Sequence, residues 1–329
     1  MAAGAGHRSC GPFWALQLLP DGTRLPLIPR PSADQTLRRR AEGWSSVLAL
    51  RQIFRPTRIA LAVAVVCAAV PAHAQSKLDA HYIVTLAGIP IGKGSWAIEI
   101  GETRYSASAT GATTGLMRVL TEGEGATTVV GTYASGKVMS ATYVSTIKSR
   151  KQKDEVHVTL DKGDVKDTRA DPPVDHDKER VPVNEGDLHN VFDPMTASIL
   201  PVPGSGNVLA AEACQHTTQI FDGRLRYELK LAFKRMDTVK AEKGYAGPVV
   251  VCAVYFKPVS GYIPSRATIR YLSQQKDMEV WLAPIAGTRM VVPFRVQGPT
   301  PIGEAAMTAS QFLSAAGPAQ ASANGRKSP

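Results

Sequence analysis

The sequence predicts a mainly β fold: an antiparallel curved sheet or partial β-barrel with one short helix. Three observations support this fold class. Stretches in which apolar and polar residues alternate recur along the chain, as in Leu78–Leu86. Short segments rich in glycine separate these stretches and are typical of tight turns. One segment, Asp193–Leu200, begins like a helix, because Asp193 suits the N-cap and Pro194 suits the first turn.

The first half of the predicted sheet is a meander, in which each strand is followed by its neighbour. The predicted strands are residues 78–86, 95–100, 104–115, 126–134, 138–148 and 156–160. Residues 87–94 are predicted to connect the first two strands, and turns are expected at Ser135-Gly136 and at Lys162-Gly163. A polar loop interrupted by prolines is expected over residues 167–187, before the predicted helix.

The second half centres on Cys214–Tyr262, which most clearly specifies a structure. Apolar residues alternate on both sides of Asp222-Gly223, and this pair is predicted to form the type I′ turn of a β-hairpin. The remaining predicted elements are a charged connection at 234–247, a strand at 249–256, an irregular crossing at 257–265, three strands at 267–272, 278–284 and 288–296, and a weak strand or helix within 298–313.

A secretory signal peptide is predicted at residues 51–74. Arginines precede an apolar core of 12 residues, Ile59 to Val70, and Ala72-His73-Ala74 forms a cleavage site, so that cleavage is expected between Ala74 and Gln75. This core is shorter than the ~20 residues that span a bilayer. We therefore expect export to the periplasm and no transmembrane segment in the mature chain. Residues 1–50 are interpreted as a non-structural leader from a start assigned too far upstream, with a disordered cytoplasmic leader as the alternative.

The mature chain is predicted to contain a single β-rich domain at 75–305 and a mostly disordered tail at 306–329. The formal charge of the whole chain is +10. Residues 1–74 account for +6 of this charge, since they hold nine arginines against three acidic residues. The remaining +4 does not require a polyanionic partner, so no nucleic-acid binding is predicted. The basic run Lys148–Glu155 is interpreted as a solvated hairpin end, or alternatively as a site attracted to anionic lipid or polysaccharide.

Two cysteines, Cys214 and Cys252, remain in the predicted mature chain. In an exported protein two cysteines most simply form one disulfide. A redox-active dithiol is the alternative, but the C-x-x-C spacing is absent, and a zinc site lacks histidines at suitable spacing.

Sequence signatures of catalysis are absent. The chain has no G-x-S-x-G, no H-E-x-x-H and no dinucleotide-binding glycine motif. Asp175-His176-Asp177 alternate in direction along an extended loop, which does not favour a shared metal ion. No catalytic residue, metal or cofactor is therefore predicted, and we expect a protein that is not an enzyme.

Several short motifs occur along the predicted domain: Gly88-Ile89-x-Ile91-Gly92, the strand containing Tyr105, Phe221-Asp222-Gly223-Arg224 with Tyr227, Cys252, and Val259-Ser260-Gly261-Tyr262. Together they resemble the motifs of domain of unknown function 3108, a family of exported proteobacterial proteins. The resemblance covers about Leu78 to Pro301, and the FDGR run with its flanking cysteines is its most specific part. It implies a β-rich periplasmic domain and transfers no catalytic residues.

The sequence favours non-catalytic binding of an apolar or amphiphilic cell-envelope molecule. Small residues next to Trp96 suggest room inside a curved sheet. The arginines of FDGRLR form either an exposed basic face, with Tyr227 in the core, or a pair facing a phosphate or carboxylate head group. The candidate ligand-lining residues are Trp96, Tyr105, Leu116, Met117, Arg224 and Arg226. The alternatives are a structural or interaction protein of the envelope and, third, a hydrolase.

Overall fold

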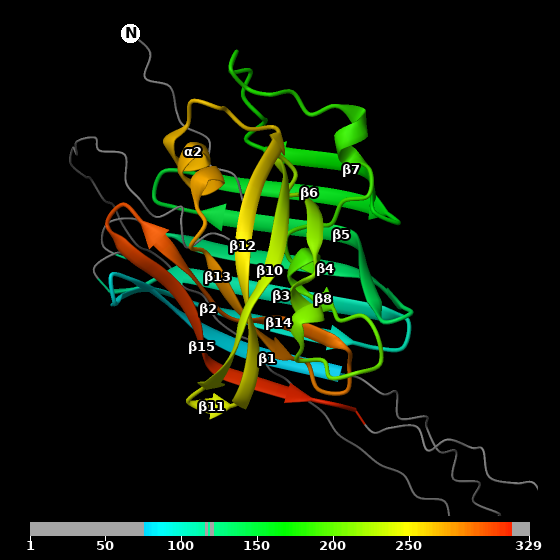
Figure 1. Ribbon diagram of the computed structural model, residues 1–329. Helices are drawn as coiled ribbons and strands as arrows, with labels where there is room; N and C mark the ends of the chain where they lie inside the picture. The colour runs from blue at the N-terminus through cyan, green and yellow to red at the C-terminus, as the bar shows by residue number, and fades with distance from the viewer. Residues whose placement is uncertain (1–75, 116–117, 119–121, 318–329) are drawn as a thin grey trace, which may run out of the picture. The chain divides into compact units, whose positions relative to one another are not determined.

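The computed structural model describes residues 76–115, 118 and 122–317 (Figure 1). Its strands form one 15-stranded sheet with the order β7-β6-β5-β4-β3-β2-β1-β15-β14-β13-β12-β10-β9. Neighbours in this order pair antiparallel throughout. The predicted mainly β fold with an antiparallel curved sheet is therefore confirmed.

The first seven strands form the predicted meander. They are β1 (Ser76–Leu86), β2 (Ile89–Ile100), β3 (Arg104–Thr113), β4 (Glu124–Ala134), β5 (Lys137–Lys148), β6 (Lys153–Asp161) and β7 (Asp164–Asp171). Three of its hairpins turn on two residues that both have positive φ: Ala87-Gly88, Ser135-Gly136 and Lys162-Gly163. Such pairs form type I′ turns, whose twist matches that of the strands. The turns predicted at Ser135-Gly136 and Lys162-Gly163 are thus present.

The second half of the sheet begins beside β1. Its strands are β8 (Leu200–Pro201), β9 (Thr217–Phe221), β10 (Arg226–Lys240), β11 (Lys243–Gly244), β12 (Ala246–Ser260), β13 (Glu279–Pro284), β14 (Met290–Thr300) and β15 (Gly303–Ala315). β15 pairs with β1 along nearly its whole length. The two short strands lie off the main order, because β8 pairs with β14 and β11 pairs with β15 in parallel.

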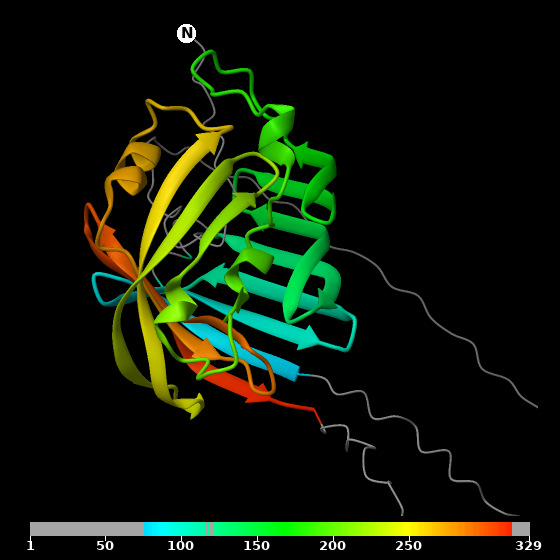
Figure 2. The same ribbon diagram turned by 45° about the vertical axis from the view of Figure 1, so that its right-hand side comes forward.

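A short segment joins the two ends of the sheet order. Val191 donates its backbone N–H to Gly163 O at the β6–β7 turn, at 2.8 Å. Phe192 donates to Gln219 O and accepts from Phe221 N, both on β9, at 2.9 Å. Figures 1 and 2 show β10 and β12 running across the meander strands rather than along them. The curved sheet therefore faces itself, and the 191–192 segment links its two ends.

The hydrophobic core consists of two clusters on opposite sides of β12. The first contains Val249 and Val251 together with buried residues of the meander, such as Ile98 and Val158. The second contains Val250 and Cys252 with buried residues of β13 and β14. Both faces of β12 are thus covered, which explains the continuous apolar run VVVC in place of an alternating pattern.

The helices differ from the prediction. Residues predicted as a strand form the helix α2 (Ala267–Gln274), whose Ile269 and Leu272 pack against the second core cluster. The predicted helix at Asp193–Leu200 is only a 3₁₀ turn, η3 (Thr196–Ser198), although Asp193 does accept the backbone N–H groups of Met195 and Thr196. The helix does not continue beyond this turn, because Leu200 and Pro201 pair with β14. Two further 3₁₀ turns are η2 (Glu185–Leu188) and η4 (Ala211–Cys214).

Several strands are longer than predicted. The expected connection at 234–247 is mostly strand, and the expected crossing at 257–265 begins with the end of β12. β2 starts at Ile89, within the predicted 87–94 connection, and β7 covers the start of the predicted polar loop. β15 runs to Ala315, so the domain continues beyond residue 305. The outer part of β10 is exposed on both faces and therefore has no apolar alternation that pattern analysis can detect.

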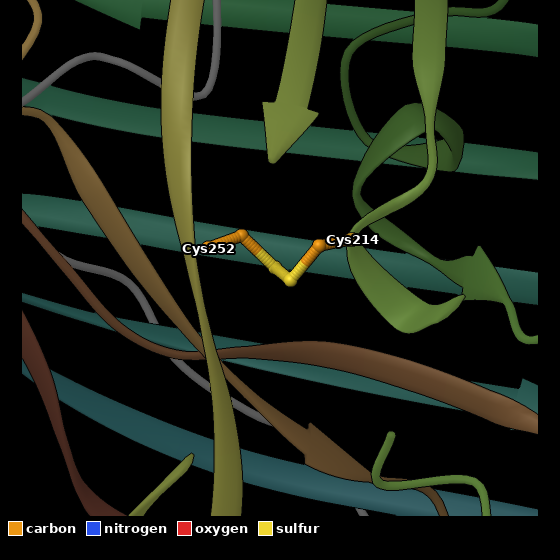
Figure 3. The surroundings of a disulfide bond; sticks show 2 residues. All are labelled: Cys214 and Cys252. Carbon is orange, nitrogen blue, oxygen red and sulfur yellow. A yellow bond between two sulfur atoms is a disulfide. The ribbon is translucent and has the colours of Figure 1, made fainter. Parts of the chain in front are cut away.

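The predicted disulfide is present. Cys214 at the end of η4 and Cys252 in the middle of β12 are bonded, with their Cα atoms 5.6 Å apart (Figure 3). Both residues are buried in the second core cluster. The bond therefore ties the irregular segment before β9 to the long strand β12.

Candidate functional site

The FDGR motif forms the loop between β9 and β10. Asp222 Oδ1 accepts the backbone N–H groups of Arg224 at 2.9 Å and of Leu225 at 2.7 Å, and Gly223 has a φ of +93°. Asp222 itself does not have a positive φ, so the predicted type I′ turn at Asp222-Gly223 is wrong. The loop spans four residues, and the Asp222 side chain holds it in place of a second left-handed residue.

Two glycines allow this loop to pack closely between neighbouring strands. A Cβ on Gly223 would lie 2.2 Å from Val156 Cγ1 on β6. A Cβ on Gly261, just beyond β12, would lie 2.0 Å from the carbonyl oxygen of Arg224. The FDGR and VSGY motifs, which are separate in the sequence, therefore meet in the fold. They place Arg224 between the end of β12 and β6.

The Arg224 guanidinium is the most unusual group in this region. Its side chain is only 5% exposed, and its Nη2 forms an ion pair with Asp154 Oδ1 at 3.7 Å, a distance too long for a hydrogen bond. Nε, Nη1 and Nη2 are all buried and have no hydrogen-bond partner among the described residues. Buried polar atoms in folded proteins nearly always have a partner, and a guanidinium offers five donors in a planar fork. This group is thus a cation prepared to receive an acceptor.

Two more buried donors belong to the adjoining ends of β10 and β12. The hydroxyl oxygens of Tyr227 and Ser260 also lack a hydrogen-bond partner among the described residues. Tyr227 is three residues after Arg224, and Ser260 pairs with Arg226 in the ladder. Burial, followed by electrostatic interaction with Asp222, Tyr143 and Asp193, raises the pKa of Tyr227 well above its usual value. Its phenol therefore stays neutral and able to donate. We refer to Asp154, Asp222, Arg224, Tyr227 and Ser260 as the Arg224 cluster.

The Asp222 carboxyl group in this cluster is perturbed by burial. Burial raises the pKa of Asp222 to about 7, against the opposing effects of the Leu225 and Arg224 backbone N–H groups and of the Arg224 charge. A carboxyl group with a raised pKa in the folded state favours folding while it is protonated. The contribution of Asp222 to the free energy of unfolding is complete below about pH 4 and is lost as the pH rises through about 7.

We therefore expect Asp222→Asn to remove part of the pH dependence of stability. The amide oxygen of asparagine can still accept the Arg224 and Leu225 N–H groups, while the titration is lost. Between about pH 4 and pH 8 the free energy of unfolding of the wild type should fall by up to about 4 kcal/mol more than that of the variant. Urea unfolding at several pH values measures this difference. Parallel pH profiles for the two proteins would show that Asp222 does not titrate in this way.

The other arginine of the motif has a structural role. Arg226 donates from Nε to Asp187 O at 3.1 Å, from Nη1 to Tyr227 O at 2.8 Å and from Nη2 to Gln219 Oε1 at 2.5 Å. Both Arg224 and Arg226 are buried, so the interpretation of an exposed basic face is wrong, whereas Tyr227 does lie in the core.

The aromatic candidates are also buried. The Tyr105 hydroxyl is hydrogen-bonded to Thr196 Oγ1, which in turn donates to Asp193 Oδ2, so it belongs to an internal polar network. Trp96 lies in the first core cluster, and its Nε1 has no hydrogen-bond partner among the described residues. A role for either side chain in lining a ligand site stays a prediction. Leu116, Met117, Ala74 and Gln75 lie outside the described residues.

Asp154 and Ser260, taken as single residues, carry no local sequence signal that marks them as part of the site. Asp154 lies in a strongly charged hairpin, where a single carboxylate does not stand out, and Ser260 lies in a proline-flanked segment. The one available signal was the VSGY motif, which contains Ser260. Its glycine, Gly261, allows the end of β12 to lie close to the Arg224 carbonyl group.

Metal and membrane-spanning features are not found in the described part of the chain. Residues 76–115, 118 and 122–317 contain no group of three or more His, Cys, Asp or Glu side chains that is arranged to hold a metal ion. Within the same residues, no helix is long and apolar enough to cross a bilayer.

Comparisons with known proteins give a family without an assigned function. A crystal structure of a β-barrel-like protein of domain of unknown function DUF1849 from Brucella abortus is similar to this chain, with a TM-score of 0.38 and 11% identity over 74% of this chain and 98% of that one. No curated protein matches. The family described as "Protein of unknown function (DUF3108)" matches residues 81–310, which is most of the chain and includes the FDGR and VSGY motifs. The chain therefore belongs to the DUF3108 family.

Proposed function

We propose that this protein is a non-catalytic periplasmic binding protein for an amphiphilic molecule with an acidic head group. In this proposal the head group binds at Arg224 and the apolar part lies against the inner face of the curved sheet. The single observation that carries it is the buried Arg224 guanidinium without a hydrogen-bond partner among the described residues. A carboxylate or phosphate oxygen is the acceptor that best matches a guanidinium fork.

The neighbouring groups also favour an acidic head group. Arg224, Tyr227 and Ser260 all offer hydrogen-bond donors, and a deprotonated acid accepts without donating. Asp154 lies at 3.7 Å from Arg224 and also accepts a hydrogen bond from Gln152 Nε2 at 3.1 Å, so its charge is shared. Apolar surroundings with a few polar groups are typical of sites for amphiphiles.

The test is Arg224→Met, which keeps the length of the side chain and removes its charge. Dodecanoate, dodecanol and dodecylamine serve as probes that share an alkyl chain and differ in head group. Wild-type protein is expected to bind dodecanoate best, and a ligand present at about 100 times its Kd should stabilise the fold by about 2.7 kcal/mol. The variant is expected to lose this shift. Native mass spectrometry and thermal unfolding provide the two measurements.

The stability of the unliganded variant separates binding from a structural role. Removing one partner of a buried ion pair is destabilising, because the other charge is left uncompensated, whereas removing both is often close to neutral. We therefore expect Arg224→Met combined with Asp154→Asn, without ligand, to be more stable than Arg224→Met alone. A double variant as unstable as Arg224→Met alone would assign Arg224 to the fold. Equal binding of dodecanol and dodecanoate would show that the ligand does not need an acidic head group.

A second candidate function is an interaction protein of the envelope. From Ala232 to Lys240, β10 pairs with β12 on one side and has no strand partner on the other among the described residues. Phe233 and Met236 in this stretch are each 45% exposed. An open strand edge with exposed apolar residues can pair with another chain. Crosslinking from these positions in cells distinguishes the two functions, since a dominant protein adduct favours the second.

A further inference from the structure

Three connections lie at one end of the sheet. The strand registers place the β5–β6, β1–β2 and β14–β15 connections at the same end, since Lys148 pairs with Lys153, Leu86 with Ile89 and with Ala305, and Thr300 with Gly303. In Figure 1 they lie along the left-hand side. None of the residues at this end that are used below belongs to the Arg224 cluster. An inference about this end therefore does not depend on the proposed ligand.

Two of these connections carry the most exposed large apolar side chains of the described residues. Ile89 follows the β1–β2 turn and is 66% exposed, and Ile302 lies in the β14–β15 turn and is 57% exposed. The two turns are neighbours, because Ala87 donates its backbone N–H to Glu304 O at 2.8 Å and Gly303 packs against Ala87. Two adjacent hairpin tips thus present isoleucine to the surroundings.

The β5–β6 connection carries positive charge at the same end. Lys148, Arg150, Lys151 and Lys153 are all exposed, and Ser149–Gln152 contains no acidic residue. Arg150 pairs with Glu122 at 2.9 Å and Lys153 with Glu155 at 2.5 Å. Lys148 and Lys151 make no ion pair among the described residues, although Glu124 lies opposite Lys148 in the ladder. In the strand order, the β5–β6 connection lies about four strand spacings, or roughly 20 Å, from the β1–β2 tip and about six, or roughly 30 Å, from the β14–β15 tip.

We propose that this end of the sheet docks on an anionic phospholipid surface. The isoleucine tips would enter the apolar boundary of the lipid, while the lysines contact acidic head groups. Exposed apolar tips at the same end of the sheet as lysines without an ion pair suit a bilayer better than a polysaccharide, which offers no apolar phase to bury isoleucine. Glu304, beside the tips, is not a free negative charge, since it pairs with Arg295 at 3.7 Å. Anionic lipid attracts each nearby lysine until salt screens the interaction.

Vesicle sedimentation tests this proposal with the full-length mature chain. Phosphatidylcholine vesicles with and without phosphatidylglycerol serve as probes, and binding is expected only where phosphatidylglycerol is present, and to weaken at high salt. Lys148→Gln with Lys151→Gln should reduce the affinity about thirtyfold. Ile89→Ser with Ile302→Ser should reduce it about tenfold or more. The outcome that overturns the proposal is equal sedimentation with both vesicle types, or none with either.

Matched variants at other positions provide the controls. Lys137→Gln with Lys162→Gln removes two exposed lysines from turns at the opposite end of the sheet, and Leu313→Ser removes an apolar side chain that is 46% exposed on β15. Both are expected to sediment like the wild type. A control that weakens sedimentation as much as the lysine or isoleucine variants would show that this end has no special role. Circular dichroism confirms that each variant is folded.

Discussion

Replacing Cys214 and Cys252 together with alanine is expected to lower the free energy of unfolding by about 4 kcal/mol. The disulfide joins residues that are 38 positions apart, and closing a loop of that length in the unfolded chain accounts for this magnitude. Alanine is the suitable replacement, since both sites are buried among apolar side chains and a serine hydroxyl would lack a partner. Guanidinium unfolding of the two oxidised proteins measures the difference.

Reduction of the wild type provides an internal control for this result. The reduced wild type and the double alanine variant should unfold at nearly the same denaturant concentration, since both lack the crosslink. A loss below about 1 kcal/mol in either protein would show that the crosslink adds little to the stability. The irregular segment that contains η4 should lose protection first, because the disulfide ties this segment to β12.

Gly261→Ala is expected to destabilise the protein by at least about 3 kcal/mol. Gly261 has a φ of +78°, which costs an L-residue about 1–2 kcal/mol. The new Cβ would also lie 2.0 Å from the Arg224 carbonyl oxygen, so the backbone at the FDGR loop must move. Chemical unfolding measures the loss, and reduced binding of dodecanoate should accompany it if that ligand binds at Arg224.

Gly136→Ala separates the cost of a positive φ from the cost of the steric contact made by the new Cβ. Gly136 has a similar φ of +76°, but no atom lies within 4 Å of the position its Cβ would take. This variant should lose only the conformational part, about 1–2 kcal/mol. Equal losses of unfolding free energy for Gly136→Ala and Gly261→Ala would mean that the close contact between Gly261 and the Arg224 carbonyl group adds nothing to the cost of the substitution.

The sequence was informative where one face of a strand is buried and the other exposed. β1 shows this well, since its buried and exposed residues alternate from Ser76 to Ile83. The two glycine turns were predictable because Ser135-Gly136 and Lys162-Gly163 each supply a residue that tolerates positive φ. The disulfide followed from the number of cysteines in the predicted mature chain.

Prediction failed where tertiary contacts decide the local structure. The six residues 267–272 fit both an alternating strand and one and a half helical turns, and packing of Ile269 and Leu272 on the second core cluster selects the helix. In the Asp222-Gly223 pair, the Asp222 side chain satisfies two backbone N–H groups, which favours a longer loop than type I′.

The candidate site was predictable only in part. Arg224 was identified as a possible head-group ligand from its motif, but its burial and the absence of hydrogen-bond partners among the described residues depend on Gly261 and on Asp154. These residues lie 37 positions after and 70 positions before Arg224 in the chain. Local patterns contain no information about contacts at such separations.

The pairing of β1 with β15 determines the order in which the fold can be completed. These two strands occupy the middle of the sheet, yet they are the first and the last of the described strands to be synthesised. The seven-strand meander can assemble from local hairpins while the C-terminal strand is still missing, which leaves the backbone groups along one side of β1 without partners. Until Gly303–Ala315 pairs with β1, this strand presents an open edge at the middle of the future sheet, and such an edge in an incomplete chain can pair with other chains and aggregate.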